Sequence, residues 1–245
     1  MGSGWAAGLL IGTIVLAGSS VQRLTGMGFA LVTVPALTLL LGPAQGVVLA
    51  NCAAGAISAV GLVGGWRQVR PAVMLPLVGA AMCTVPAGSW VAARLPEPVL
   101  MTGVGALVCS AVLLVLRGAR VPALRGAKGA VAAGAAGGFM NASAGVGGPP
   151  MSLYAVNAGW SMREFVPNAL FYGVAVNAVS VLSNGLPHLS TPVWSLAGAG
   201  LAAGALIGGA LTDRVPEQRA RTFVLLLALA GGAVTLAKGL WGTAT

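Results

Sequence analysis

Apolar residues run through the chain in ten long stretches, which polar, glycine or proline residues separate from one another. The stretches cover residues 5–21, 26–41, 45–65, 71–93, 97–116, 129–141, 149–160, 164–184, 192–212 and 217–240. A helix needs roughly 20 apolar residues to cross a ~30 Å hydrocarbon layer, and most of the stretches approach that length. They are uninterrupted rather than alternating, which argues against a membrane β-barrel. The pattern predicts an all-α polytopic membrane protein.

Two consecutive stretches near the middle of the chain are too short to cross a membrane comfortably. They cover residues 129–141 and 149–160, and the sequence between them is Asn141-Ala-Ser-Ala-Gly-Val-Gly-Gly-Pro-Pro150. Proline stops a helix, and glycine permits backbone that other residues avoid. Irregular backbone at membrane depth survives only when it is buried in protein or lines a wet cavity. We expect a broken helix or a re-entrant hairpin here, with residues 5–21 and 26–41 forming either an equivalent hairpin or two full spans.

Composition strengthens the membrane interpretation. The chain of 245 residues is 57% hydrophobic and only 7% charged, with a mean hydropathy of +0.93. The 38 glycines favour close packing between membrane helices. The net charge of +9 is spread over short loops, so it indicates membrane orientation rather than nucleic-acid binding.

The two halves of the chain repeat each other. Gly26-Met-Gly28 recurs as Gly145-Val-Gly147, and Arg94-Leu-Pro-Glu97 recurs as Arg214-Val-Pro-Glu217. Five segments per half is an odd number, so the second copy is expected to be inverted relative to the first, as in many secondary transporters. The predicted organisation is an N-terminal repeat over residues 1–116, a basic cytoplasmic linker over 117–128 and an inverted C-terminal repeat over 129–245.

Basic residues fall mostly on one side of the predicted membrane layout. Ten lie on the first side (Arg67, Arg70, Arg117, Arg120, Arg125, Lys128, Arg163, Arg214, Arg219 and Arg221) and two on the other (Arg94 and Lys238). Because positive loops stay in the cytoplasm, the first side is predicted to be cytoplasmic and both termini outside. The membrane is predicted to be the cell's inner, cytoplasmic membrane.

The glycine-rich motifs resemble those of the TauE/SafE family of sulfite and organosulfonate exporters. The resemblance rests on Thr25-Gly-Met-Gly-Phe-Ala-Leu-Val-Thr-Val-Pro35 and on Gly145-Val-Gly-Gly-Pro-Pro150, and it extends over nearly the whole chain. Family members typically continue the first motif with glycines, where this chain has Phe29 and Ala30. The resemblance implies a membrane protein that transports small anions such as sulfite, sulfoacetate or related sulfonates.

Arg23 is the sharpest candidate for a substrate contact. No acidic residue stands near it in the sequence. If it lies inside the membrane, it needs a partner, and a guanidinium suits sulfonate oxygens. If residues 5–21 and 26–41 both cross, Arg23 is instead an ordinary cytoplasmic anchor.

The other candidate substrate contacts are hydroxyl, amide and backbone N–H donors at the two glycine-rich tips and on neighbouring segments. They are Thr25, Gly26, Gly28, Asn51, Asn141, Ser143, Gly145, Gly147, Gly148, Asn168 and Tyr172. A half-helix that begins at such a tip directs its positive end at an anion. The alternatives are tight packing of the glycines and simple interhelical hydrogen bonds for each polar side chain.

The sequence therefore predicts a secondary carrier, and more specifically an exporter, that holds a small anion (sulfite, a sulfonate or a carboxylate) between the two tips near the membrane midplane. An anion channel and a membrane assembly factor without transport activity remain alternatives. No hydrolase or nucleotide-binding motif occurs, and the three cysteines form no CxxC pair. We expect no enzymatic activity, cofactor or metal, while monomer and homodimer both stay open.

The charge bias gives a testable topology. Single cysteines introduced at the termini should react with an impermeant thiol reagent added to intact cells, and cysteines within 117–128 should be protected. The reverse labelling pattern would contradict the orientation.

Overall fold

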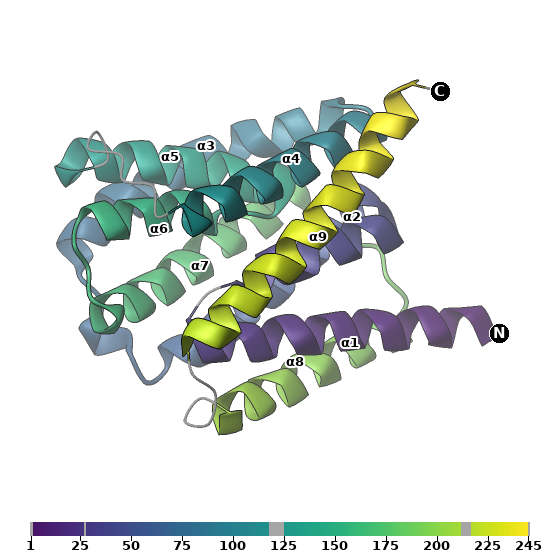
Figure 1. Ribbon diagram of the computed structural model, residues 1–245, viewed down its shortest axis with the longest axis horizontal. Helices are drawn as coiled ribbons and strands as arrows, with labels where there is room; N and C mark the ends of the chain where they lie inside the picture. The colour runs from purple at the N-terminus through teal and green to yellow at the C-terminus, as the bar shows by residue number, and fades with distance from the viewer. Residues whose placement is uncertain (1, 27, 118–124, 212–216, 245) are drawn as a thin grey trace.

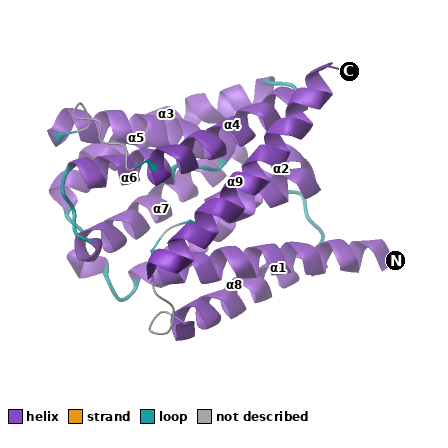
Figure 2. Ribbon diagram, viewed as in Figure 1, coloured by secondary structure: helices purple, strands orange, loops and turns teal. Residues whose placement is uncertain are grey.

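The chain folds into helices packed in one bundle (Figures 1 and 2). The computed structural model describes residues 2–26, 28–117, 125–211 and 217–244. The helices are α1 (Gly2–Thr25), α2 (Phe29–Leu62), the 3₁₀ turn η1 (Trp66–Gln68), α3 (Pro71–Arg94), α4 (Glu97–Leu116), α5 (Gly126–Ala144), α6 (Gly148–Asn157), α7 (Met162–Asn184), α8 (Thr191–Leu211) and α9 (Glu217–Ala244). Strands are absent from the described part of the chain, so the predicted all-α fold is confirmed.

Helix α2 is two helices joined at a sharp break. Gly42 has φ 78° and ψ 162°, and Pro43 follows it. The chain turns back here, because a Cβ placed on Gly46 would lie 2.7 Å from the carbonyl oxygen of Leu37. The break separates the segments that the hydrophobic pattern predicts as 26–41 and 45–65. With it, each half of the described chain contains five α-helical segments.

Each half also contains one short helix directly after its glycine-rich motif. These are the first part of α2, Phe29–Leu41, and the ten-residue α6. At 1.5 Å per residue they span about 20 Å and about 15 Å, too little to cross a ~30 Å layer alone. Helix α5 is longer than its predicted 129–141, since it runs over Gly126–Ala144. Broken helices at the starts of both halves, predicted from the glycines and prolines, are thus present.

Two long helix pairs hold the halves together through small residues. Helix α1 lies along α8 in the same direction, since Gly8 faces Leu196 and Gly208 faces Ser20. Helix α3 lies along α5 in the same way, with Gly134 against Leu77. The glycines allow the two helix backbones to touch. Such close packing is common in membranes, because the hydrophobic effect does not drive helices together in lipid.

Equivalent helices of the two halves meet in antiparallel pairs. On α4 and α9, Gly105 faces Leu236 while Pro98 faces Gly239. The second part of α2 and α7 also run in opposite directions, because Gly61 faces Leu170 and Gly55 faces Asn177. Matching helices of the two halves therefore meet in α4–α9 and α2–α7, whereas α1–α8 and α3–α5 each join a first helix to a fourth. The inverted-repeat prediction and the boundaries at 116 and 129 remain predictions, and part of their sequence basis (Met27, residues 118–124 with Arg120, and residues 212–216 with Arg214) lies outside the described residues.

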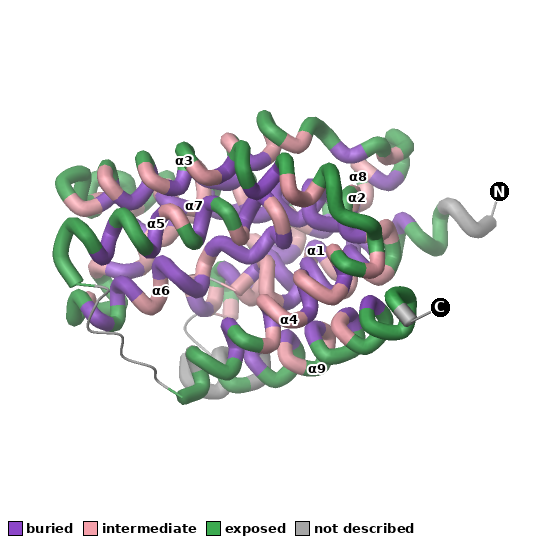
Figure 3. The backbone as a smooth tube through the Cα atoms, turned by 90° about the horizontal axis from the view of Figure 1, so that it is seen from above, coloured by how far each residue is buried: buried purple, intermediate pink, exposed green. Residues whose placement is uncertain are grey.

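Seven helices within the described ranges are long and apolar enough to cross a membrane. Large apolar side chains cover the outside, including Leu182 (83% exposed) and Leu206 (75% exposed). Figure 3 shows the buried positions concentrated in the middle of the bundle and the exposed ones around it. An apolar exterior of this kind suits lipid rather than water. The chain is a multi-pass membrane protein.

The α1–α8 contact yields a matched pair of substitutions on α8. Gly204→Ala places a methyl group 2.7 Å from Cβ of Ser19, whereas Gly198→Ala meets nothing within 4 Å. Overpacking costs about 1–3 kcal/mol, so Gly204→Ala should lower the thermal midpoint of the purified protein in detergent. Gly198→Ala should leave the midpoint unchanged or raise it slightly, because alanine favours helix over glycine. Equal midpoints would show that close α1–α8 packing does not limit stability.

Candidate functional site

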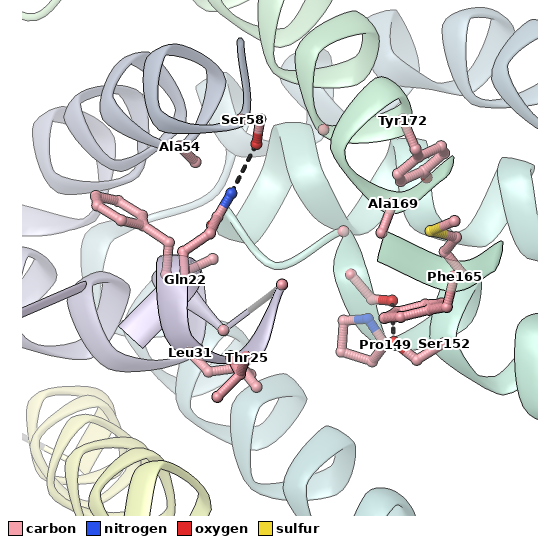
Figure 4. A pocket seen from close by; sticks show the side chains of 18 of the residues that line it. Gln22, Thr25, Leu31, Ala54, Ser58, Pro149, Ser152, Phe165, Ala169 and Tyr172 are labelled. Atoms are coloured by element: carbon pink, nitrogen blue, oxygen red, sulfur yellow. Dashed lines mark hydrogen bonds between the residues drawn. The ribbon is translucent and has the colours of Figure 1, made fainter. Parts of the chain in front are cut away.

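A cavity of about 210 Å³ lies where the two broken helices meet. Its wall includes the end of α1, the start of α2, the α5–α6 turn, α6 and the first half of α7 (Figure 4). Two apolar clusters flank it, one that includes Phe29 and one that includes Met151, Phe165 and Tyr172. Of the predicted site residues, Thr25, Gly26, Gly28, Asn141, Gly147, Gly148 and Tyr172 line this cavity.

Asn141 stabilises the α5–α6 turn with its whole amide group. Its Nδ2 donates to Asn177 Oδ1 at 3.0 Å and to Ser180 Oγ at 2.9 Å. Its Oδ1 accepts from the Gly147 N–H at 3.2 Å. Both N–H bonds of the amide are used inside the protein, so Asn141 positions the turn and α7 rather than offering a spare donor. The Gly147 N–H is likewise engaged.

Gln22 and Ser58 form the corresponding contact in the first half. Gln22 Nε2 donates to Ser58 Oγ at 2.8 Å, and both residues are buried. The two residues are 36 apart in sequence, the same separation as Asn141 and Asn177. Gln22, Ser58 and Asn177 all line the cavity. Ser58 and Asn177 stand out in the sequence as polar residues inside apolar stretches, whereas Gln22 was not predicted. The repeat spacing of 119 residues was the signal that could have found Gln22, since it pairs Gln22 with Asn141 and Ser58 with Asn177.

The long helices α1 and α5 end at glycines with the same backbone conformation. Gly26 has φ 74° and its counterpart Gly145 has φ 70°, a left-handed conformation that glycine adopts without steric cost. Beyond these turns the short helices begin at Gly28 and Gly147, and neither is capped by a side chain.

The starts of the two short helices differ in what they can donate. Gly28, Phe29, Ala30 and Leu31 of α2 line the cavity, and the first N–H groups of a helix have no partner within the helix. Helix α6 has Pro149 and Pro150 in its first turn, and proline has no N–H to offer. The start of α2 is therefore the better source of backbone donors.

Tyr172 has a hydroxyl group beside the cavity, close to Gly137 of α5. It is 3% exposed, it lines the cavity, and its hydroxyl group has no hydrogen-bond partner. An unpaired hydroxyl in a buried site costs free energy that a ligand could recover. Figure 4 places Tyr172 and Phe165 across the cavity from Gln22 and Ser58.

Charged side chains are absent from the described lining of the cavity. Arg23 does not line it and is exposed. Its side chain points past Gly61 on α2 and Gly209 on α8 instead. A direct contact between Arg23 and a ligand in the cavity thus stays a prediction without support from this geometry.

Four other predicted residues lie behind or beyond the cavity wall. Asn51 donates from Nδ2 to the Asn141 carbonyl oxygen at 3.2 Å, and Gly145 packs beside Val34. The Asn168 Oδ1 accepts from the Arg70 N–H at 2.8 Å, next to the ion pair of Arg70 with Glu164. Ser143 lines a different cavity. Asn51 and Asn168 therefore act on the backbone of other elements in this structure.

The second cavity, of about 530 Å³, lies on the other side of the α5–α6 turn. Ala142 and Ser143 line it, together with the break in α2 and the end of α7. Its polar groups include Gln45, Ser89, Asn184 and His188. The turn that borders the first cavity through Asn141 and Gly147 thus borders the second as well.

Helices of spanning length surround a mostly apolar cavity at two broken helices, an arrangement typical of secondary transporters. The sequence model described as Sulfite exporter TauE/SafE matches residues 10–235, and the chain belongs to this family. Its members are membrane transporters of sulfite and sulfonates, not enzymes. No curated protein and no solved structure matches the chain. The resemblance seen in the glycine motifs is confirmed.

The α5–α6 turn should tolerate no side chain at Gly147. A Cβ there would lie 2.7 Å from Asn141 Cβ and 2.8 Å from Asn141 Oδ1. Its φ is −88°, so the penalty is steric and not a backbone strain. Gly147→Val should abolish transport, and Gly147→Ala should lower the thermal midpoint. Gly103→Ala, where a Cβ meets nothing within 4 Å, is the control. Normal flux in Gly147→Val liposomes would contradict this role.

Proposed function

We propose that the protein is a secondary carrier that binds a small sulfur-containing anion in the cavity between the α1–α2 and α5–α6 breaks. One observation carries the proposal. Both glycine-rich helix breaks border the same cavity, whose wall includes Tyr172, with a hydroxyl that has no hydrogen-bond partner, and an uncapped helix start.

A neutral site suits an anion that has to be released again. The starts of α2 and α6 direct the positive ends of their helix dipoles toward the cavity. The Tyr172 hydroxyl and the first-turn N–H groups of α2 offer hydrogen bonds to anion oxygens. A fixed arginine in the cavity would bind more strongly, but tight binding slows release. Arg23 is better placed to attract anions toward the bundle than to hold one inside.

The arrangement of the two halves supports a carrier over a fixed pore. The antiparallel pairs α4–α9 and α2–α7 are those expected of inverted repeats related by a two-fold axis in the membrane plane. In such proteins the substrate lies at the repeat interface near the midplane. The Gln22–Ser58 contact lies within the first half and the Asn141–Asn177 contact within the second, and all four residues line the one cavity.

The cavity suits either sulfite or an organosulfonate such as sulfoacetate. Gln22, Ser58 and Tyr172 supply polar groups for the oxyanion, while Met151, Val156 and Phe165 supply an apolar surface for a short hydrocarbon part. We propose export across the cytoplasmic membrane, with both termini outside. An anion channel of the same architecture is the alternative, and a membrane assembly factor without transport activity is the third candidate.

Liposomes with the purified protein should take up labelled sulfite or sulfoacetate, and uptake should saturate. Unlabelled substrate inside should accelerate entry by counterflow, which a channel cannot produce. Tyr172→Phe should weaken substrate binding by roughly tenfold or more, the effect of losing a hydrogen bond to a charged group. The thermal midpoint should hold or rise, because the hydroxyl has no partner in the protein.

Tyr154→Phe is the matched control, since Tyr154 lies outside the cavity lining. Arg23→Gln should slow entry at low salt and leave saturating flux nearly unchanged if Arg23 attracts anions from outside the cavity. Complete loss of substrate binding in Arg23→Gln would instead support a direct contact between Arg23 and the substrate. Flux without saturation or counterflow would favour the channel, and no flux of any anion would leave the assembly factor.

A further inference from the structure

The two cavities of this protein both border the end of α5 and the α5–α6 turn. Asn141, Val146 and Gly147 border the first cavity, and Ala142 and Ser143 border the second. His188, which lines the second cavity, is exposed. The two cavities therefore both border the end of α5 and the turn that follows it.

Two asparagine side chains from other helices fix the turn. Asn51 of α2 donates to the carbonyl oxygen of Asn141 at 3.2 Å. Asn184, the last residue of α7, donates to the carbonyl oxygen of Ala142 at 3.0 Å. Both carbonyls belong to the last turn of α5, and the Asn141 carbonyl oxygen also accepts from the Gly145 N–H at 2.9 Å. The two amides thus attach the end of α5 to the helices around it.

The first half of the chain has no such pair of amides at the equivalent positions. At the repeat spacing of 119 residues, the counterpart of Asn184 is Gly65 and the counterpart of Asn51 is Leu170. Asn168, near that position on α7, accepts from Arg70 instead. The attachment is therefore specific to the α5–α6 turn and cannot be explained as a shared packing feature of the repeats.

One of the two asparagine side chains also has an oxygen without a hydrogen-bond partner. Asn51 is 1% exposed, yet its Oδ1 has no hydrogen-bond partner. A buried unpaired oxygen destabilises the arrangement that holds it. Asn51 therefore holds the turn while retaining an acceptor that another arrangement of the turn could satisfy.

We propose that the α5–α6 turn is the gate between the two cavities and that Asn51 and Asn184 are positioning residues that keep it closed. Release of the two hydrogen bonds lets the turn move and connects the substrate cavity to the second cavity. The second cavity is then the passage to the membrane face on the His188 side. The inference rests on the proposed carrier function, since it takes the first cavity as the substrate site.

Cysteine accessibility tests the gate without substrate. Cys52, Cys83 and Cys109 are replaced by serine, and Ala169→Cys puts a reporter in the wall of the first cavity. A His188→Cys protein identifies the vesicle face on which the second cavity opens. A charged, impermeant thiol reagent added on that face should label the Ala169→Cys reporter slowly. Asn184→Ala or Asn51→Ala should raise that rate roughly fivefold, the shift expected from losing one hydrogen bond of ordinary strength.

Asn157→Ala is the matched control, because Asn157 donates only within its own helix, to Leu153, and lines neither cavity. Should Asn184→Ala fail to fold, Asn184→Asp keeps the size and replaces the donor with an oxygen that repels the Ala142 carbonyl. It should raise the rate as much. An unchanged rate in both the Asn51 and Asn184 variants, or an equal rise in Asn157→Ala, overturns the gate. Absence of flux in the wild type would reject the carrier and leave the labelling result intact.

Discussion

Backbone groups freed at membrane depth need partners inside the protein, because lipid supplies none. The α5–α6 break frees the last carbonyls of one helix and the first N–H groups of another, and buried amides meet this need. Asn141 accepts from Gly147 and donates to α7, while Asn51 and Asn184 donate to the end of α5. The break can therefore exist at the centre of the bundle. The cavity lies where the helices are interrupted, and hydrogen bonds to neighbouring helices fix the helix ends around it.

Helix packing places this break at the right depth. The parallel pairs α1–α8 and α3–α5 let two backbones approach through glycine, so each long helix is supported along its length up to the break. Small residues reduce the separation between axes, and the side chains near the breaks then reach across to α7 and to the second part of α2. Gln22 of α1 donates to Ser58 of α2, and Asn141 of α5 donates to Asn177 of α7. The packing of small residues and the polar contacts of the site are parts of one arrangement.

The sequence predicted the fold more fully than the site. Hydropathy and the prolines at Pro43, Pro149 and Pro150 identify the helices and their breaks, because these depend on local chemistry. The site depends on which side of each helix faces the cavity, and this is set by contacts between distant segments. Asn51, Ser143 and Asn168 satisfy every local criterion for a ligand contact, yet they lie behind the cavity or beyond it. Gln22 gave no local signal, and only comparison of the two halves at one fixed spacing would have found it.

The two halves of the chain differ in the hydrogen bonds at their helix breaks. Two copies with the same hydrogen bonds at both breaks would be equally stable open to either side, and neither cavity would be favoured. Here Asn184 and Asn51 have Gly65 and Leu170 as counterparts, so only one of the two turns is attached by amides. One turn held by a few hydrogen bonds of about 1 kcal/mol each is strong enough to favour one arrangement and weak enough for a bound anion to reverse it. A carrier needs a preference of that size, because a larger one would trap the protein on one side of the membrane.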